Sequence, residues 1–444
     1  MAKVKGPLFS LTAFGTVGNL LTYRRTPGKV AAYVKPVPTD RESGCQLMQR
    51  ASFASAVSAW GALPGASKAW WNMYAAGMRI SGYISFMKSA LLGACTPGGG
   101  EPEGYGCEAY PYVDTIGPVG GGSGYVDIIT AVDYEVTTYA EILAALADAD
   151  GTPFHKYIYV PEGVEIDCVA RRDLLIKPGV VLYSRRGLGS NVGGVIKITT
   201  LVADSTYPMF LFVSTGCRVT GLQIKGPDDN LWVATGNTHE IWLGLRCYGA
   251  GIEVDNCEIS GWPYGAIAFT GDYTIDGYVH HSYIHHNARM GFGYGVQVDN
   301  CTALIEACIM DYNRHCITGE RDYPVSNYRA LYCDFGAHNL VAQCVDMHGG
   351  NDISAPSVPA GGSIEVGWCT FRTVTGYPTW VPTPVSIRGV PLIGADFHNN
   401  DFLYHADLQT FLIYQACDNI GGVDPPPEVP WQNITENDNR IAAA

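Results

Sequence analysis

Apolar and polar residues alternate in short runs along much of the chain, and the runs are broken by glycine and asparagine. The segment ALIEACIMDYNRHCITG, residues 303–319, is one example, in which Arg314 and His315 lie where two runs meet. Alternation with a period of two is typical of a β-strand with one buried face. The pattern therefore predicts two short strands joined by a turn at Arg314 and His315.

Such segments repeat when they are aligned on one small or polar position. The aligned residues, which we call the ladder, are Cys257, Ser282, Cys308, Cys333, Cys369 and Asn400, at steps of 25, 26, 25, 36 and 31 residues. An apolar strand residue follows each of them closely. A repeat of about 25 residues built from short strands is typical of a β-solenoid, whose stacked turns share one core. We therefore expect an all-β body, a single-stranded parallel β-helix of roughly ten turns.

The 14 cysteines contain no CxxC pair, so the spacing of a zinc ribbon is absent. Cys257, Cys308 and Cys333 are expected to be buried ladder thiols, and neighbouring turns of the ladder lie about 4.8 Å apart. Stacked strands do not generally point two sulfur atoms at each other. We therefore expect thiols in the ladder and keep disulfide pairing as the alternative.

Composition agrees with a β-rich globular protein, since 47% of residues are hydrophobic and only 16% are charged. No apolar run reaches the roughly 18–20 residues that span a bilayer. The N-terminal residues contain glycines where a signal peptide has its apolar core, so we expect no cleaved signal.

The charge is unevenly distributed. Residues 1–94 hold 11 Lys and Arg and two acids, whereas the remainder holds 17 bases and 40 acids. This difference indicates two domains with different partners. A basic module can dock onto an acidic surface, while the alternative is a small domain with a solvated basic face. The bases are scattered rather than clustered, so nucleic acid is not the favoured partner.

Local patterns give the expected elements. A hairpin over 16–38 turns at TPGK, two helices follow over 43–62 and 65–80, and a helix over 138–149 begins with a capping box. The expected order is a basic α+β docking module over 1–94, a Gly/Pro-rich linker over 95–125, the β-helix over 126–420 and a C-terminal tail over 421–444.

Two columns beside the ladder collect aromatic and polar residues. They read Trp262, Asn287, Asn313 and His338 at five positions after the ladder, and Tyr264, Arg289, His315 and Leu340 at seven. We expect these side chains to leave the core and form a carbohydrate platform, with ring faces on sugar C–H groups and polar groups on hydroxyls. The candidate ligand-binding residues are Trp262, Tyr264, Arg289, Tyr294 and Asn313.

Histidines concentrate in the same region, where seven of the eleven lie between residues 280 and 348. Three interpretations compete: a metal site with converging ligands, acid–base chemistry in a groove, or polar residues that satisfy the backbone at turns. The unequal offsets of these residues from the ladder argue against one tight cluster. We expect no metal and no cofactor.

Stretches between residues 138 and 375 carry a resemblance to a known family. They are EILAALADA, YIYVPEGVEID, LLIKPGVVLYSRRG, CRVTGLQIKGP, VDNCEISGW, VHHSYIHHN, GFGYGVQV, YNRHCI and DMHGG. In this order they resemble the single-stranded right-handed parallel β-helix proteins of bacteria and archaea, whose superfamily includes pectate-lyase-like enzymes, polysaccharide hydrolases and phage tailspikes. The chain departs from that family in having Cys where Asn is usual in the ladder. The catalytic positions that the resemblance implies are His286, Arg314, His315, Asp346 and His348.

Residues 15–88 resemble a short module of phage and prophage structural proteins, in GTVGNLLTYRR, QLMQRASFASAVSAWGAL, KAWWNMYAAG and SGYISFMK. The two resemblances imply a virion-associated or surface-displayed adhesion protein. Its N-terminal module would dock onto a larger assembly, and its β-helix would bind glycans. A homo-oligomer, commonly a trimer, is implied by analogy.

Two alternatives remain open. One is a polysaccharide lyase or glycoside hydrolase with His315 as acid or base, Arg314 or Arg289 on a uronate carboxylate, and Asp346 orienting a partner. The other is a purely structural filament or capsid component.

Overall fold

The computed structural model describes three strands near the N-terminus and most of the chain after residue 103. The described ranges are 15–17, 21–26, 29–34, 104–110, 117–150, 155–169, 174–199, 209–228, 243–271, 276–289, 291–319, 326–339, 343–350, 359–372, 384–403, 413–415 and 432–442. The chain divides into two compact units, residues 1–72 with 81–99 and residues 73–80 with 100–444.

The first unit contains an antiparallel sheet of β1 (Gly15–Val17), β2 (Leu21–Thr26) and β3 (Lys29–Val34). β2 pairs with β3 in antiparallel register from Leu21 with Val34 to Thr26 with Lys29, so the two strands of the expected hairpin are present. The expected helices over 43–62 and 65–80 lie outside the described residues.

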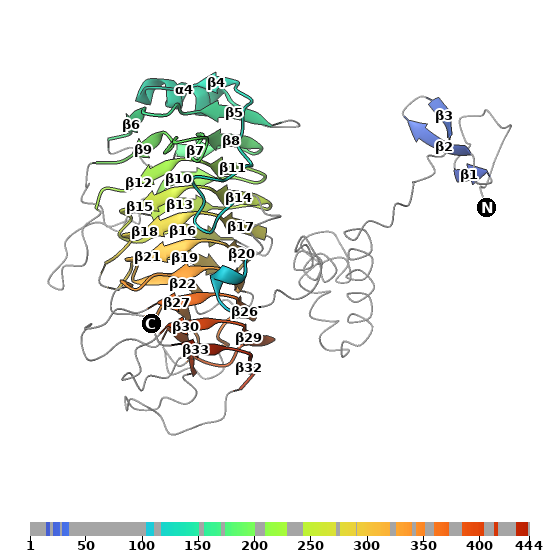
Figure 1. Ribbon diagram of the computed structural model, residues 1–444. Coiled ribbons are helices and arrows are strands. Elements are labelled where there is room, and N and C mark those ends of the chain that lie inside the picture. The colour runs from blue at the N-terminus through green and yellow to red at the C-terminus, as the bar shows by residue number, and fades with distance from the viewer. Residues whose placement is uncertain are drawn as a thin grey trace. The chain divides into compact units, whose positions relative to one another are not determined.

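The second unit contains a right-handed parallel β-helix, called the coil here, in which three parallel sheets run along one axis (Figure 1). Each strand pairs with the equivalent strand one turn earlier, and the sheets contain nine, eleven and ten strands. The predicted fold class and turn number are therefore confirmed.

The nine-stranded sheet consists of β7 (Leu174–Ile176), β10 (Met209–Val213), β13 (Leu243–Cys247), β16 (Gly265–Thr270), β19 (Tyr294–Asp299), β22 (His315–Gly319), β25 (Val345–Met347), β28 (Val385–Ile387) and β31 (Ile413–Gln415). The eleven-stranded sheet consists of β4 (Tyr134–Glu135), β5 (Lys156–Tyr159), β8 (Val180–Tyr183), β11 (Arg218–Thr220), β14 (Ile252–Asp255), β17 (Asp276–His280), β20 (Thr302–Glu306), β23 (Asn327–Leu331), β26 (Ser363–Gly367), β29 (Gly394–His398) and β32 (Ile434–Asn437). The ten-stranded sheet consists of β6 (Glu165–Asp167), β9 (Val195–Lys197), β12 (Gln223–Lys225), β15 (Glu258–Ser260), β18 (Tyr283–His285), β21 (Ile309–Asp311), β24 (Asp334–Phe335), β27 (Thr370–Arg372), β30 (Asp401–Leu403) and β33 (Arg440–Ala442).

Apolar side chains at equivalent positions stack along the axis and form the core of the coil. In the nine-stranded sheet the stacked row is Leu211, Leu245, Ile267, Val296, Ile317, Val345 and Val385, all fully buried. From the ten-stranded sheet, the rings of Phe335, Phe371 and Phe402 stack at centroid separations of 4.8 and 4.7 Å. Each buried side chain of this kind contributes about 1.5–3 kcal/mol, so stacking supplies the stability that a single turn lacks.

The predicted ladder lies at the turn between the eleven- and ten-stranded sheets, and all six of its residues are fully buried. Each follows a residue with a left-handed backbone, which lets the chain turn sharply from one sheet into the next. These left-handed residues are Asn256, His281, Ala307, Tyr332, Trp368 and Asn399, with φ between 47° and 55°. The ladder cysteines are free thiols, as expected.

A helix covers one end of the coil. It is α4 (Tyr139–Asp148), and the side chain of its N-cap Thr138 accepts a hydrogen bond from the Glu141 amide while the Glu141 carboxylate accepts one from the Thr138 amide. The predicted capping box is therefore present. Figure 1 shows the helix beside β4 and β5, and its buried residues Ile142 and Leu146 close the apolar core.

At the other end, the coil extends beyond the boundary at residue 420 that the sequence suggested. β32 pairs with β29, and β33 pairs with β30. Residues 432–442 therefore form a turn of the coil rather than part of a tail.

Residues 104–110 and 117–125, which we call the strap, lie along the outside of the coil and are the cyan segment of Figure 1. The Cys107 amide donates to Thr370 Oγ1 at 2.9 Å, and the Gly120 amide donates to the Ala307 carbonyl at 2.8 Å. The Tyr125 hydroxyl donates to Asp255 Oδ2 at 2.6 Å. This part of the expected linker is therefore bound to the coil.

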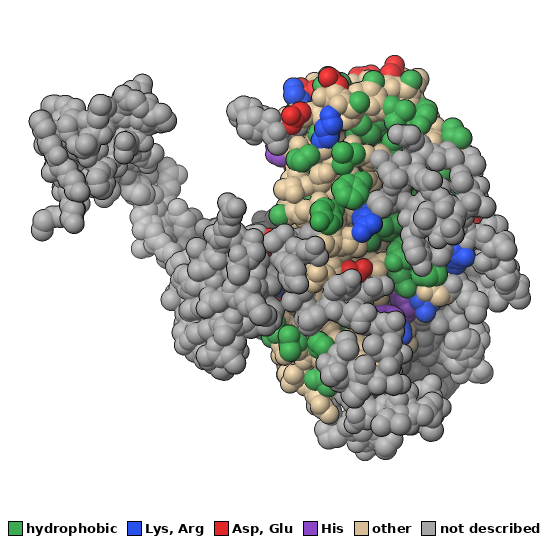
Figure 2. All heavy atoms as spheres, turned by 180° about the vertical axis from the view of Figure 1, so that it is seen from behind, with side chains coloured by type: hydrophobic (Ala, Val, Ile, Leu, Met, Phe, Trp, Pro, Cys, Tyr) green, Lys and Arg blue, Asp and Glu red, His purple; other side chains and the backbone are tan. Residues whose placement is uncertain are grey.

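Within the described residues, no helix is long and apolar enough to cross a membrane. In the opposite view, acidic and basic side chains lie near one another at the end that carries α4 (Figure 2). The described surface on this side shows no patch of a single sign there.

Candidate functional site

A row of polar side chains faces outward from the second half of the nine-stranded sheet. We call it the polar row, and its members in register are Gln297, Thr318, Asp346 and Ser386. Their neighbours along each strand belong to the core, so alternation directs the polar row away from the core. None of the four is more than 2% exposed. A buried polar row on an outer face is a candidate site, because polar groups out of water need partners.

Asp346 is the electrostatic centre of this face. Arg388 donates to both of its oxygens, from Nε to Oδ1 at 2.9 Å and from a terminal nitrogen to Oδ2 at 2.6 Å. His348 Nε2 lies 2.9 Å from the same Oδ2. Burial alone would raise the pKa of Asp346, but the surrounding histidines and Arg388 outweigh it and hold the pKa well below its usual range. Asp346 is therefore a fixed negative charge.

His315 lies beside Asp346 and is fully buried. Its Nδ1 is 2.7 Å from the Gln343 carbonyl oxygen, and its Nε2 is 3.5 Å from Asp346 Oδ2. Burial lowers the pKa of His315 to about 3, although Asp346 acts in the opposite direction. The ring is therefore neutral at pH 7, with Nδ1–H donating to Gln343 and a lone pair on Nε2. Among the described residues, Nε2 has no hydrogen-bond partner.

Gln297 leaves a second acceptor without a partner. Its Nε2 donates to Asp299 Oδ2 at 2.7 Å and to the Tyr264 hydroxyl at 3.4 Å. Its Oε1 is buried and has no hydrogen-bond partner within the described part of the chain. An unmet buried acceptor costs about 1–3 kcal/mol, so this face is suited to a ligand that brings hydrogen-bond donors.

Aromatic and cationic side chains extend the same face. Tyr294 stacks on His315 with ring centroids 5.8 Å apart, and Tyr264 meets Tyr294 edge to face at 5.7 Å. Burial lowers the pKa of the Arg314 guanidinium, against the pull of Tyr294 and Asp346. The structure thus brings together six of the residues predicted from the sequence. They are Tyr264, Tyr294, Arg314, His315, Asp346 and His348.

Two candidate ligand-binding residues lie inside the coil, which corrects the expectation that their column leaves the core. Trp262 is fully buried, stacks on Phe210 at 5.4 Å and donates from Nε1 to the Ile224 carbonyl at 3.3 Å. Asn313 is fully buried and accepts a hydrogen bond from Asn287 Nδ2 at 2.9 Å. The chain turns inward at this column, so it satisfies buried backbone groups rather than meeting a ligand.

His286 lies on a different turn, after the ten-stranded sheet. Its ring stacks on Tyr312 at 4.4 Å, and Tyr312 stacks on His338 at 4.5 Å. The faces of these rings cover one another, so mainly their edges are available to a ligand. Arg289 forms an isolated bridge with Phe292 before β19, and burial lowers the pKa of its guanidinium.

Three residues of this face were not predicted from the sequence, namely Gln297, Thr318 and Arg388. A strand alternation in register with Asp346 is the signal that could have identified the first two. Arg388 lies 42 positions after Asp346, and this distance conceals their pairing in the sequence.

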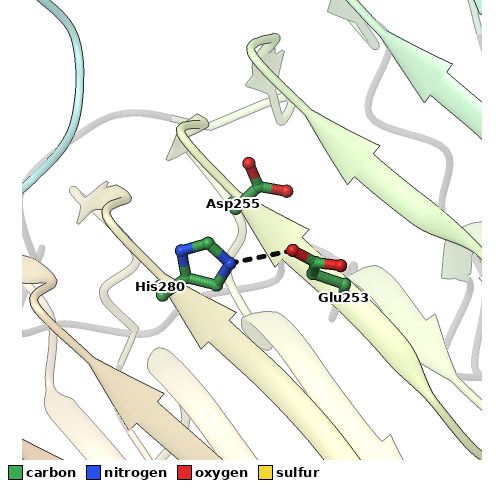
Figure 3. Close-up of side chains that lie close together, drawn as sticks. All are labelled: Glu253, Asp255 and His280. Atoms are coloured by element: carbon green, nitrogen blue, oxygen red, sulfur yellow. Dashed lines mark hydrogen bonds and ion pairs between the residues drawn. The ribbon is translucent and has the colours of Figure 1, made fainter. Parts of the chain in front are cut away.

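The side chains of Glu253, Asp255 and His280 form a second cluster, on the eleven-stranded sheet (Figure 3). Their ligand atoms lie within 4.8 Å of one another, a spacing that could hold a metal ion. However, Arg218 donates to both oxygens of Asp255, at 2.7 and 2.8 Å, and Tyr125 and Thr220 also donate to Oδ2. The guanidinium already supplies the positive charge that this carboxylate needs, so the cluster is structural.

Neither a protein-family model nor a curated protein matches the chain. Solved structures that are similar to it include an alginate lyase and two pectin methylesterases. An alginate lyase from Paenibacillus sp. str. FPU-7 is 14% identical with a TM-score of 0.43, over 69% of this chain and 94% of that one. A pectin methylesterase in complex with a hexasaccharide is 12% identical with a TM-score of 0.34, over 71% and 91%.

The third is the rice weevil pectin methyl esterase, 13% identical with a TM-score of 0.33, over 71% of this chain and 90% of that one. At these identities and scores the similarity assigns no activity to this chain. The architecture rests on the strand pairing itself, and the function must be argued from the polar row.

Proposed function

We propose that the polar row and its surroundings bind a hydroxyl-rich carbohydrate. The observation that carries this proposal is the pair of buried acceptors, His315 Nε2 and Gln297 Oε1, which have no hydrogen-bond partner among the described residues. Sugar hydroxyls are hydrogen-bond donors, and binding them would satisfy both atoms.

The neighbouring side chains support the same ligand class. Tyr264 is partly exposed beside Tyr294, and tyrosine offers both a ring for sugar C–H groups and a hydroxyl for polar contacts. Arg314 adds donors to the same face.

Binding of the full-length protein to a panel of neutral and acidic oligosaccharides, measured by calorimetry, tests the proposal. His315→Ala and Gln297→Ala should each weaken binding about tenfold, which corresponds to roughly 1.4 kcal/mol. His398→Ala is the matched control, because His398 lies on the eleven-stranded sheet and bonds to Glu365 there. Equal losses in all three variants, or no binding at all, would contradict the proposal.

A second candidate function is cleavage of the bound polysaccharide. It is favoured by the neutral His315, whose ring is oriented by Gln343 and whose Nε2 carries a lone pair beside Asp346. A neutral imidazole can accept a proton as a general base, and a bound substrate would have to raise its pKa towards the working pH for efficient transfer. Arg314 or Arg289 would then hold a substrate carboxylate.

Product analysis separates cleavage from simple binding. A lyase releases unsaturated sugars that absorb in the ultraviolet, whereas a hydrolase releases reducing ends without that absorbance. His315→Ala should abolish either product. Binding without any product would leave the protein as an adhesin.

We also propose that the module of residues 1–94 attaches the coil to a larger assembly at a virion or extracellular surface. Support comes from the charge, because this part holds 11 bases and two acids while the remainder is acidic. Deleting residues 1–94 should abolish particle association and preserve oligosaccharide binding. Sedimentation of the intact chain tests whether it self-associates into a homo-oligomer.

A further inference from the structure

Two cysteines are the chain neighbours of His315 and of Gln343, the residue whose carbonyl orients the His315 ring. Cys316 follows His315 in β22, and Cys344 follows Gln343, whose carbonyl binds the His315 ring. The amides of Cys316 and Ile317 both donate to the Cys344 carbonyl oxygen, at 2.8 and 2.9 Å. The next residues along, Ile317 and Val345, pair in register. The two cysteines are therefore direct neighbours on adjacent turns.

We propose that Cys316 and Cys344 are a redox-active pair that closes into an intramolecular disulfide on reaction with a low-molecular-weight disulfide. Both are free thiols in the structure, and the paired backbone places them on adjacent turns directly beside each other. Neighbouring strands lie about 4.7–4.9 Å apart. This spacing is within the Cα separation of about 4.4–6.8 Å that a disulfide bridges.

Accessibility distinguishes this pair from the ladder thiols. Cys308, Cys333 and Cys369 also stack on neighbouring turns, but all three are fully buried. Cys344 is partly exposed and lies just before β25, outside the regular strand. Its Sγ also accepts a hydrogen bond from Asn339 Nδ2 at 3.6 Å. An oxidant therefore reaches Cys344 first.

The reaction consists of two thiol–disulfide exchanges. The Cys344 thiolate attacks one sulfur of glutathione disulfide, which forms a mixed disulfide and releases one glutathione thiolate. The deprotonated Cys316 sulfur then attacks the Cys344 sulfur and displaces the second glutathione. In total, two protein thiols lose two hydrogens and two electrons, and one glutathione disulfide becomes two glutathione thiols. Burial raises the pKa of Cys316, so the second exchange is the slower one.

Peptide mapping of the full-length protein tests the proposal. The protein is equilibrated with glutathione disulfide, quenched in acid, unfolded and alkylated before digestion and mass spectrometry. The expected product is a peptide pair joined through Cys316 and Cys344, with Cys308, Cys333 and Cys369 alkylated. Treatment with dithiothreitol should abolish the joined pair.

Three serine variants make the result specific. Cys316→Ser should stop the reaction at a glutathione adduct on Cys344, whereas Cys344→Ser should leave Cys316 unmodified. Cys308→Ser, a matched ladder variant, should form the bridge as the wild type does. A stable glutathione adduct on Cys344 in the wild type, or a bridge between other cysteines, would overturn the proposal.

Hydrogen exchange gives a second readout that does not depend on digestion chemistry. The amides of Cys316 and Ile317 bond to the Cys344 carbonyl, so a bridge should slow their exchange relative to the reduced protein. Unchanged exchange in a sample that contains the joined peptides would mean that the bridge forms only after unfolding, which contradicts a native pair.

Discussion

The outer faces of the nine-stranded and eleven-stranded sheets have the same strand geometry but differ in how completely their polar side chains are paired. On the eleven-stranded sheet, each of the central carboxylates has a cationic or phenolic partner. The pairs are Glu253 and Asp255 with Arg218, Glu306 with Tyr278, and Glu365 with Arg329 and His398. The strap adds the Tyr125 hydroxyl to Asp255 on this face.

On the nine-stranded sheet, the polar row is as buried as Asp255 but incompletely paired, since His315 Nε2 and Gln297 Oε1 lack partners among the described residues. Burial and polarity alone therefore do not identify a binding site. The difference lies in whether the hydrogen bonds close within the protein, as polar networks that stabilise a fold do. Four predictions test this comparison.

The largest effect is expected on the eleven-stranded sheet. Arg218→Ala would leave the fully buried Asp255 without its cation, and should lower the free energy of unfolding by about 3–5 kcal/mol. Arg246→Ala is the matched control, because within the described residues this outward arginine donates to a neutral hydroxyl, Thr270 Oγ1 at 3.0 Å, rather than to a carboxylate. Urea unfolding measures the free energy of unfolding of both variants. Equal decreases in the two variants would contradict the claim that the eleven-stranded sheet depends on its ion pairs.

Tyr125→Phe should have the next largest effect. It removes the hydrogen bond from the strap to Asp255 while retaining the ring, and bonds to charged groups contribute about 1.5–3 kcal/mol. Limited proteolysis should then cut the strap faster than it cuts the coil. An unchanged unfolding midpoint would show that the strap contributes little to the pairing of this face.

The stability of the two faces should depend on pH in opposite directions. Burial alone would lower the pKa of His398, but Glu365 and Asn399 outweigh it and raise the pKa above 6.5. The stability that His398 provides is thus complete below its unfolded pKa and is lost as pH rises through the folded pKa. The pKa of His315 is instead lowered to about 3. Its unfolded form binds a proton that the folded form does not, so stability falls as pH drops from 6.5 towards that value.

Unfolding of two variants between about pH 5 and pH 8 separates these contributions. His398→Gln should lose most stability at the acidic end, and His315→Gln should lose least there. The same pH profile in both variants would contradict the assigned protonation states.

The smallest change is expected for Gln297→Met. It removes an acceptor without a partner, which offsets the loss of the bond to Asp299, so stability should change by less than about 1 kcal/mol. Oligosaccharide affinity should nevertheless fall. A large loss of stability with full affinity would reassign Gln297 to the structural network.

The coil could be predicted from the sequence because the first four ladder residues recur at a nearly constant spacing of about one turn. Cys257, Ser282 and Cys308 are spaced by one turn each, and the left-handed residue before each of them fixes the same corner. The direction of neighbouring columns was harder to infer. Trp262 lies only five residues after Cys257, yet the turn at Gly261, with φ of 78°, returns it to the core.

The site could be predicted in part for a related reason. His315, Asp346 and His348 were predicted because the family resemblance points to them and because they lie in or beside the histidine-rich region. Arg388 was not, since the spacing of turns becomes irregular towards the C-terminal end of the coil. Residue type alone also could not show that Gln297 leaves an acceptor unpaired, because that depends on the bond between its amide nitrogen and Asp299.

The strap imposes an order on assembly. Turns of the coil can stack one after another as the chain leaves the ribosome, because each needs only the turn before it. Cys107, however, binds Thr370, which is 263 residues later in the chain. The early half of the strap can therefore bind the coil only after the turn that contains Thr370 has been synthesised and folded. Attachment of this half of the strap is thus a late step in assembly.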